Sequence, residues 1–97
     1  MSLFDLYITE ASKLNGGNYV NWKFKLINVL EALSLWLIVK EDKQKPTNLL
    51  SLLDWNSWET QAKVLICMSV KDNIIPHIRN SKISKDTWDK LKGLYEC

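Results

Sequence analysis

Apolar residues recur at spacings of three and four along most of the chain, and this periodicity restricts its fold more than any other feature. The main series are Tyr19, Trp22, Leu26, Val29, Leu30, Leu33 and Trp36 or Leu37; then Trp55, Trp58, Ala62, Leu65, Ile66 and Ser69; then Trp88, Leu91, Leu94 and Tyr95. Such spacings place side chains on one face of an α-helix. The sequence therefore predicts an all-α fold, a compact bundle of about four to five helices with little or no sheet.

Polar and glycine-containing segments separate these series. Residues 15–18, Asn-Gly-Gly-Asn, are a strong turn signal that divides an N-terminal arm, residues 1–14, from a helical domain, residues 15–97. We expect loops at 40–48 and 80–85, and a short helix over 72–79 with Pro76 in its first turn or at a kink. Residues 35–39 lose the helical period and fit either another turn or a short extended piece. The expected helix N-caps are Asn18, Asp54 and Ser84.

The tryptophans are the largest candidates for the core. The chain has 97 residues, enough for one domain, and 5 of them are Trp. Trp22, Trp58 and Trp88 each lie on the apolar stripe of a predicted helix, so we expect them to form one core. We expect Gly16 and Gly17 to serve chain geometry, with one of them at positive φ, because that conformation is cheap only for glycine.

Residues that could support catalysis or metal binding are scarce. His77 is the only histidine, so no catalytic residue set is predicted. Cys67 and Cys97 lack the flanking pattern of a metal or redox motif, and reduced structural thiols in a cytoplasmic protein are the expectation. We therefore predict no catalytic residue, no cofactor, no metal and no small-molecule substrate. The longest apolar stretch, residues 33–39, is too short for a membrane span.

The net charge of +2 is low for a dedicated nucleic-acid binder. The basic residues of the last third nevertheless define an alternative function, a small helical module that binds RNA or DNA. Its candidate contacts are Arg79, Lys82, Lys85 and Lys92. Acidic residues four positions away, as in Asp86 with Lys90, favour a solvated and self-paired surface instead.

Four short patterns, in order, resemble the Gag polyproteins of copia-type LTR retrotransposons. Residues 14–22 match the opening L-x-G-x-N-Y-x-x-W, which contains Tyr19 and Trp22. Trp36 and Val39 lie in an LW-x-x-V pattern. The remaining patterns comprise Trp58, Ala62, Ile66 and Ser69, followed by Trp88, Leu91 and Tyr95. The resemblance covers about residues 13–96.

This resemblance implies the N-terminal part of a retrotransposon capsid, an all-α protein that self-associates around RNA. The sequence has no zinc knuckle of the family's RNA-packaging type and no aspartic-protease motif. We therefore expect a non-enzymatic, Gag-like interaction domain. Its expected partners are itself, as a homodimer or larger assembly, and related Gag proteins, with weak RNA binding as a further expectation.

The predicted self-association surface is the arm, because its apolar cluster lies outside the helical series. The candidate residues are Leu3, Phe4, Leu6, Tyr7 and Ile8. Clusters of this kind usually mark a partner surface. In the competing interpretation the arm folds back over its own helices and completes a monomer. Leu35, Leu37, Ile38 and residues 49–53 are similarly crowded and form a second candidate region.

Overall fold

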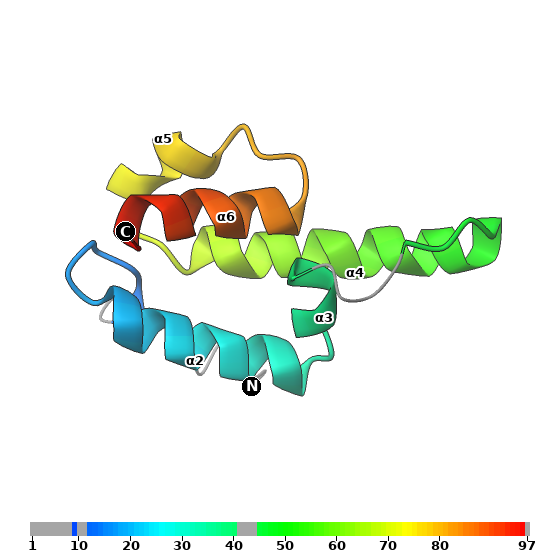
Figure 1. Cartoon of the computed structure of the whole chain (residues 1–97), viewed down its shortest axis with the longest axis horizontal. Helices are drawn as coiled ribbons and strands as arrows, with labels where there is room; N and C mark the ends of the chain where they lie inside the picture. The colour runs from blue at the N-terminus through cyan, green and yellow to red at the C-terminus, as the bar shows by residue number, and fades with distance from the viewer. Residues whose placement is uncertain (1–8, 10–11, 41–44, 97) are drawn as a thin grey trace.

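The computed structural model describes residues 9, 12–40 and 45–96, and most of them are helical (Figure 1). In chain order the elements are α2 (Tyr19–Ala32), α3 (Trp36–Val39), α4 (Leu49–Met68), the 3₁₀ turn η2 (Asp72–Ile74), α5 (Ile75–Ile78) and α6 (Ser84–Tyr95). The described residues contain five α-helices and no strand, which confirms the predicted all-α class. One isolated parallel bridge joins Leu14, before α2, to Val70, after α4.

Helix α2 follows the predicted apolar series. Tyr19, Trp22, Leu26, Val29 and Leu30 are all buried on one face. The helix ends where Ser34 adopts a φ of 61°, a left-handed conformation that usually favours glycine. The N–H of Leu35 then donates to the carbonyl of Leu30 at 2.7 Å, closing a Schellman-type turn. This turn stops the series before Leu33, which is exposed.

Residues 36–39 form a single helical turn, α3, which settles the two options that the sequence left open. Leu35, Ile38 and Val39 are fully buried, and α3 packs against both α4 and α6. Leu35 and Ile38, named above in the second candidate region for self-association, are therefore core residues, and that part of the prediction is wrong. The reversal at Ser34 turns this segment back onto the bundle. Of the three residues named in this segment as a candidate interaction region, only Leu37 stays half-exposed.

Helix α4 begins earlier than predicted. The expected cap, Asp54, lies inside the helix, which starts at Leu49 with Asn48 as its N-cap. The Asn48 side-chain oxygen accepts hydrogen bonds from the N–H groups of Leu50 at 2.9 Å and Ser51 at 3.3 Å. The apolar run 49–53 is thus the first part of a 20-residue helix that extends well beyond the rest of the bundle (Figure 1).

Helix α6 is also capped differently from the prediction. Ser84 is its first residue rather than its N-cap, and the buried Ser84 hydroxyl has no hydrogen-bond partner among the described residues. The backbone N–H of Ser84 instead donates to the carboxylate of Glu59, on α4. A helix start packed against another helix can take its cap from that neighbour. The short helix predicted over 72–79 is confirmed as η2 and α5, with Pro76 in the first turn of α5.

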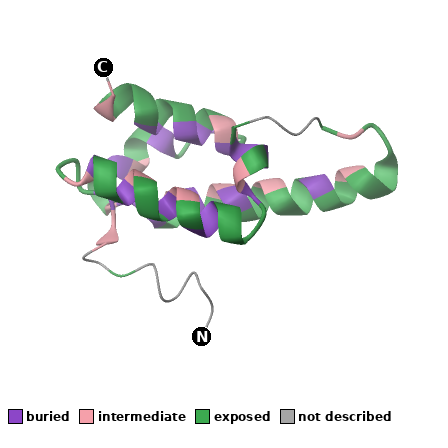
Figure 2. Cartoon of the chain, turned by 60° about the horizontal axis from the view of Figure 1, so that its bottom comes forward, coloured by how far each residue is buried: buried purple, intermediate pink, exposed green. Residues whose placement is uncertain are grey.

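Three tryptophans meet in the core, but they are not the predicted three. The Trp22 and Trp88 rings stack with centroids 5.6 Å apart, and Trp36 meets Trp88 edge-on at 5.2 Å. Trp58 is 39% exposed, so its predicted core position is wrong, whereas Trp55 is 6% exposed. Trp55 is nearer the projecting end of α4, most of which is exposed (Figure 2), so helical spacing alone does not show which member of the series a neighbouring element covers.

The Trp22 indole ties α2 to the end of α4. Its N–H donates to the backbone carbonyl of Ser69 at 2.9 Å and approaches the Ser69 hydroxyl at 3.2 Å. The same carbonyl accepts from the N–H of Leu14 at 2.8 Å, and the carbonyl of Leu14 accepts from Lys71 at 2.9 Å. These contacts hold the segment before α2 against the α4–η2 connection.

Candidate interaction surfaces

The predicted self-association residues Leu3, Phe4, Leu6, Tyr7 and Ile8 lie outside the described residues. The structure therefore leaves this prediction as it stands. The described residues present three other features that are open to a partner. They are the loop and polar cluster at the start of α2, the groove between α2 and α6, and the outer face of α4.

The Asn15–Asn18 loop is held by its own side chains. Gly16 has a φ of +96°, which confirms that one of the two glycines takes a positive φ. Asn18 occupies the N-cap position of α2, but its side chain makes no cap hydrogen bond, so the predicted role is wrong. Its oxygen accepts instead from the N–H of Asn15 at 2.9 Å, and the Asn15 oxygen accepts from Gly17 at 2.8 Å. These amides are thus engaged inside the loop.

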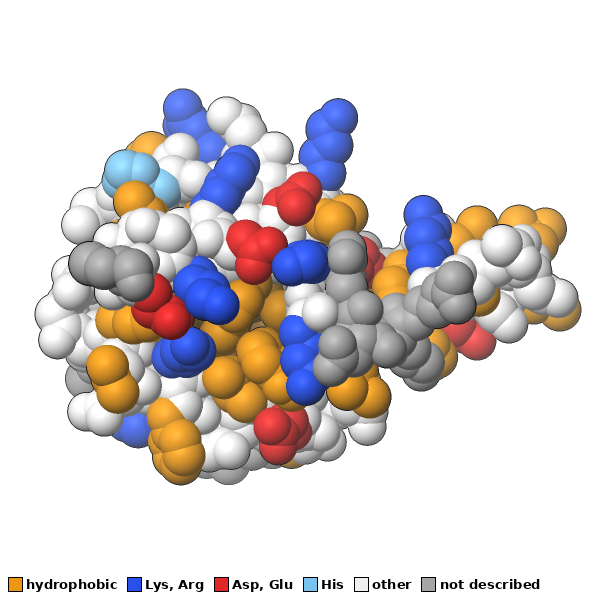
Figure 3. Space-filling model, in the orientation of Figure 1, with side chains coloured by type: hydrophobic (Ala, Val, Ile, Leu, Met, Phe, Trp, Pro, Cys, Tyr) orange, Lys and Arg blue, Asp and Glu red, His pale blue; other side chains and the backbone are white. Residues whose placement is uncertain are grey.

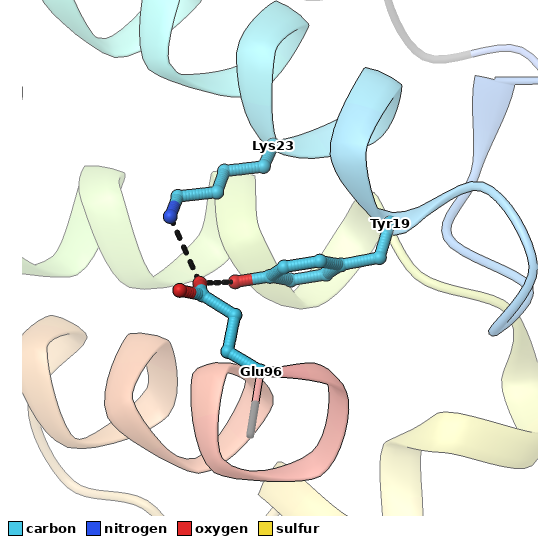
Figure 4. Close-up of polar contacts among 3 residues, drawn as sticks. All are labelled: Tyr19, Lys23 and Glu96. Atoms are coloured by element: carbon cyan, nitrogen blue, oxygen red, sulfur yellow. Dashed lines mark hydrogen bonds and ion pairs between the residues drawn. The ribbon is translucent and has the colours of Figure 1, made fainter.

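A polar cluster joins the start of α2 to the end of α6 (Figure 4). The carboxylate of Glu96 accepts a hydrogen bond from the Tyr19 hydroxyl and forms an ion pair with Lys23, whose Nζ lies 2.8 Å away. The hydrogen bonds from Lys23 and then Tyr19 lower the pKa of Glu96. Burial raises the pKa of Tyr19, and the contact with Glu96 raises it further. The Tyr19 ring also stacks on Tyr95, with centroids 5.4 Å apart.

An apolar groove of about 420 Å³ runs beside this cluster, between α2 and the end of α6. Val20, Phe24 and Ile27 line it from α2, and Tyr95 lines it from α6. Phe24 is 68% exposed and Val20 is 77% exposed. Figure 3 shows hydrophobic side chains gathered on this face, with lysines and acidic residues around them. This groove is open to solvent and mainly apolar, so it suits a protein side chain better than a charged ligand.

The outer face of α4 carries the largest group of exposed apolar side chains. Its members are Leu49, Leu50, Leu53, Val64 and Met68, which are 45–75% exposed. The first three lie on the part of α4 that projects from the bundle, where Figure 3 also shows hydrophobic side chains at the tip.

The four candidate nucleic-acid contacts lie along α5, the following loop and α6. Arg79 follows α5, Lys82 lies in the loop, and Lys85 and Lys92 lie at opposite ends of α6. Lys85 forms an ion pair with Asp89 at 2.9 Å. An acidic side chain therefore lies between the two lysines of α6, which weakens the positive field that a phosphate backbone would meet.

The described residues offer little for bond-making chemistry. Burial raises the pKa of the Cys67 thiol, and the nearby Lys63 opposes this only partly, so the neutral thiol is favoured over the reactive thiolate. Among the residues that the structure describes, no group of three or more His, Cys, Asp or Glu could hold a metal ion. None of the described helices has the length and apolar character needed to cross a membrane.

Sequence reasoning identified residues 49–53, where Leu49, Leu50 and Leu53 are exposed, but it missed the apolar surface of α2 and the rest of the exposed apolar face of α4. Val20, Phe24 and Ile27 are spaced four and three apart on α2, and Val64 and Met68 are four apart on α4. These spacings are visible in the sequence, but the series that contain tryptophan are the stronger candidates for the core. Helical spacing shows that residues share a face, and it does not show whether another element covers that face.

Comparison with known proteins identifies the family. The model of the gag-polypeptide of LTR copia-type matches residues 27–97, more than half of the chain. The match includes the patterns around Trp36, Trp58 and Trp88, whereas the opening pattern around Gly16 and Trp22 precedes it. No curated protein and no solved structure matches significantly. The chain therefore belongs to the copia-type LTR gag-polypeptide family.

Proposed function

We propose that this chain is a non-enzymatic interaction domain of a copia-type Gag that associates with copies of itself or with related Gag proteins. Gag polypeptides are typically structural proteins rather than enzymes, which supports the non-enzymatic part of the proposal. The observation that carries it is the set of large apolar side chains left exposed although the described residues already form a hydrophobic core. They occur as groups on α2 and α4 rather than singly.

Clusters of exposed apolar side chains indicate a partner surface better than single ones do, because single exposed apolar residues are common on any protein surface. Contiguous apolar patches on a small domain usually mark a surface that a partner covers. Phe24 on α2 and Leu50 on α4 are 68% and 75% exposed, and each has further exposed apolar residues within one turn. Burying such side chains is worth about 1.5–3 kcal/mol each, which is enough to drive association when several act together.

The test is the solution mass of the intact chain over a concentration series. Analytical ultracentrifugation from about 1 μM to about 500 μM is expected to show a mass that rises above the monomer value. A second series with a related copia-type Gag is expected to show mixed complexes. A chain that stays strictly monomeric and also fails to bind the related Gag would contradict the proposal.

The N-terminal arm remains the surface that the sequence favours, and it needs its own test. Removal of Met1–Tyr7 is expected to weaken association if Leu3, Phe4 and Leu6 contribute to the interface. Unchanged association would leave the interface to the helical surfaces described above. If the intact chain is monomeric and removal of the arm lowers its stability, the competing interpretation holds, in which the arm completes a monomer.

Nucleic-acid binding through Arg79, Lys82, Lys85 and Lys92 remains the alternative function. Phosphate contacts release counterions, so this function requires RNA affinity that falls steeply with salt concentration. Self-association through apolar surface requires only a shallow salt dependence. Measuring both processes at about 50 mM and 200 mM salt therefore separates the two functions. A cytoplasmic site of action is part of the same proposal.

A further inference from the structure

The outer face of α4 has a second, regular series of residues besides the one that it buries. Along this face the spacing alternates between three and four: Leu50, Leu53, Ser57, Thr60 and Val64, followed by Cys67, which is partly buried against the core. At about 100° per residue these positions form one continuous stripe, flanked by Leu49 and Met68. The core-facing residues Trp55, Ala62 and Ile66 lie on the other side of the helix.

No charged residue lies in this stripe. The charged residues of α4 are Asp54, Glu59 and Lys63, and all three lie outside it. Glu59 is directed to the bundle, where it caps α6. A solvent-facing helix surface about 30 Å long normally carries charges. A long uncharged face with apolar ends, opposite a buried face, is typical of a helix that is covered on both sides.

The order of residues along the stripe is self-complementary. Its two ends are apolar, at Leu53 and at Val64, and its middle carries small polar side chains, Ser57 and Thr60. If two copies of α4 pack antiparallel about a two-fold axis at the middle, each apolar end meets the other apolar end. The facing pairs are then Leu53 with Val64 and Ser57 with Thr60, while Leu50 lies over the position of the partly buried Cys67.

We propose that a second copy of this chain covers the outer face of α4, as an antiparallel α4–α4 pair related by a two-fold axis. This inference rests on the proposed function and names the surface that carries it. The antiparallel direction opposes the two helix dipoles and places the projecting end of each α4, with Leu50 and Leu53, over the body of the other copy. That contact buries the side chains that are most exposed on this helix. Two-fold symmetry is also the commonest symmetry among homo-oligomers.

The area of the outer α4 face determines how tightly the two copies are expected to bind each other. A helix of 20 residues offers a strip of roughly 30 Å by 10 Å, which is smaller than the standard interface of about 800 Å² per partner. Pairing through α4 is therefore expected to be weak, with a dissociation constant in the micromolar range. Weak contacts of this size suit an interaction that is strengthened by repetition in a larger assembly.

Two single substitutions test the surface. Leu53→Glu and Val64→Lys each place a charge against an apolar partner residue, so each variant is expected to dimerise about tenfold or more weakly than the parent. Both side chains are solvent-exposed in the single chain, at 59% and 45%, so the fold is expected to persist, as circular dichroism will verify. Leu94→Glu on α6, at a 45% exposed position outside the candidate surfaces, is the matched control and should leave dimerisation unchanged, whereas Val20→Glu tests the α2 groove.

Mixing the two variants tests the direction of the helices. In the antiparallel pair a mixed dimer joins Glu at position 53 to Lys at position 64 and keeps one native Leu53–Val64 contact, so mixing is expected to restore dimers. In a parallel pair these positions never meet, and the mixture stays monomeric. Failure of the mixture to dimerise would therefore overturn the antiparallel arrangement.

The remaining outcomes separate this inference from the proposed function. If the parent dimerises and both α4 variants dimerise equally well, the α4 surface is wrong while self-association stands. If Val20→Glu weakens dimers as much as Leu53→Glu does, the interface includes the α2 groove, and the α4 pair alone is rejected. If the parent neither dimerises nor binds a related Gag, both proposals fail together.

Discussion

Replacing Trp22 by phenylalanine removes one hydrogen-bond donor and part of one ring from the centre of the core. Trp22 is 1% exposed, and its indole N–H donates to the Ser69 carbonyl at 2.9 Å. The carbonyl keeps its bond from Leu14, so the change leaves no buried group unsatisfied and costs about 1 kcal/mol for the lost hydrogen bond. The missing ring area, on the order of 50 Å², adds about 1.2 kcal/mol, and the cavity adds to this.

The total loss for Trp22→Phe is therefore about 2–3 kcal/mol in the free energy of unfolding. For a chain of this length that corresponds to a fall in melting temperature of about 8–15 °C. A domain typically has about 5–15 kcal/mol of stability, so the variant is expected to stay folded at low temperature. Urea unfolding followed by far-UV circular dichroism measures the difference directly.

Trp58→Phe is the matched control, because the same chemical change is made at a position that is 39% exposed. Its expected cost is below about 1 kcal/mol. Equal losses for the two variants, or a larger loss for Trp58→Phe, would refute the assignment of Trp22 rather than Trp58 to the core. That result would instead support a core that includes Trp58, as helical spacing alone predicts.

Three further results are expected. Gly16→Ala lowers stability by about 1–2 kcal/mol because its φ is +96°, whereas Gly17→Ala changes it by a few tenths; thermal melts of both variants check this. Glu59→Ala costs about 1 kcal/mol because α6 loses its N-terminal acceptor, and Glu59→Gln, which keeps an acceptor oxygen, costs clearly less in urea unfolding. Glu96→Gln loses stability relative to the parent at neutral pH. The folded pKa of Glu96 lies below its unfolded value of 4.5, so its contribution is present above pH 4.5 and fades as the pH falls through the folded pKa. Unfolding curves from pH 7 to pH 3 should therefore converge for the two proteins.

The helices themselves were largely predictable from the sequence, since helix formation follows a repeat that is local in the chain. The buried face of α2 agrees with the series that begins at Tyr19, apart from Leu33, and α6 buries Trp88 and Leu91 as predicted but leaves Leu94 45% exposed. The chain reversal at Gly16 and the short helix around Pro76 also follow from the conformational limits of single residues. Membership of the Gag family was predictable for the same reason, because its patterns are short and regularly spaced.

The candidate surfaces were less predictable, because exposure depends on what the rest of the chain covers. The groove beside Phe24 exists because α6 ends there and leaves one face of α2 open. The polar cluster joins Tyr19 to Glu96, residues that lie 77 positions apart. No local pattern links residues at that distance, so neither feature was expected.

Local periodicity thus determined where helices form and which side chains share a face, because the α-helix repeats every 3.6 residues whatever surrounds it. Tertiary packing alone decided which of those faces are covered. It buried Trp55 rather than Trp58, and it used Glu59 from α4 to cap α6 in place of Ser84. Burial and capping depend on which groups lie nearby in space, and the course of the folded chain sets that proximity.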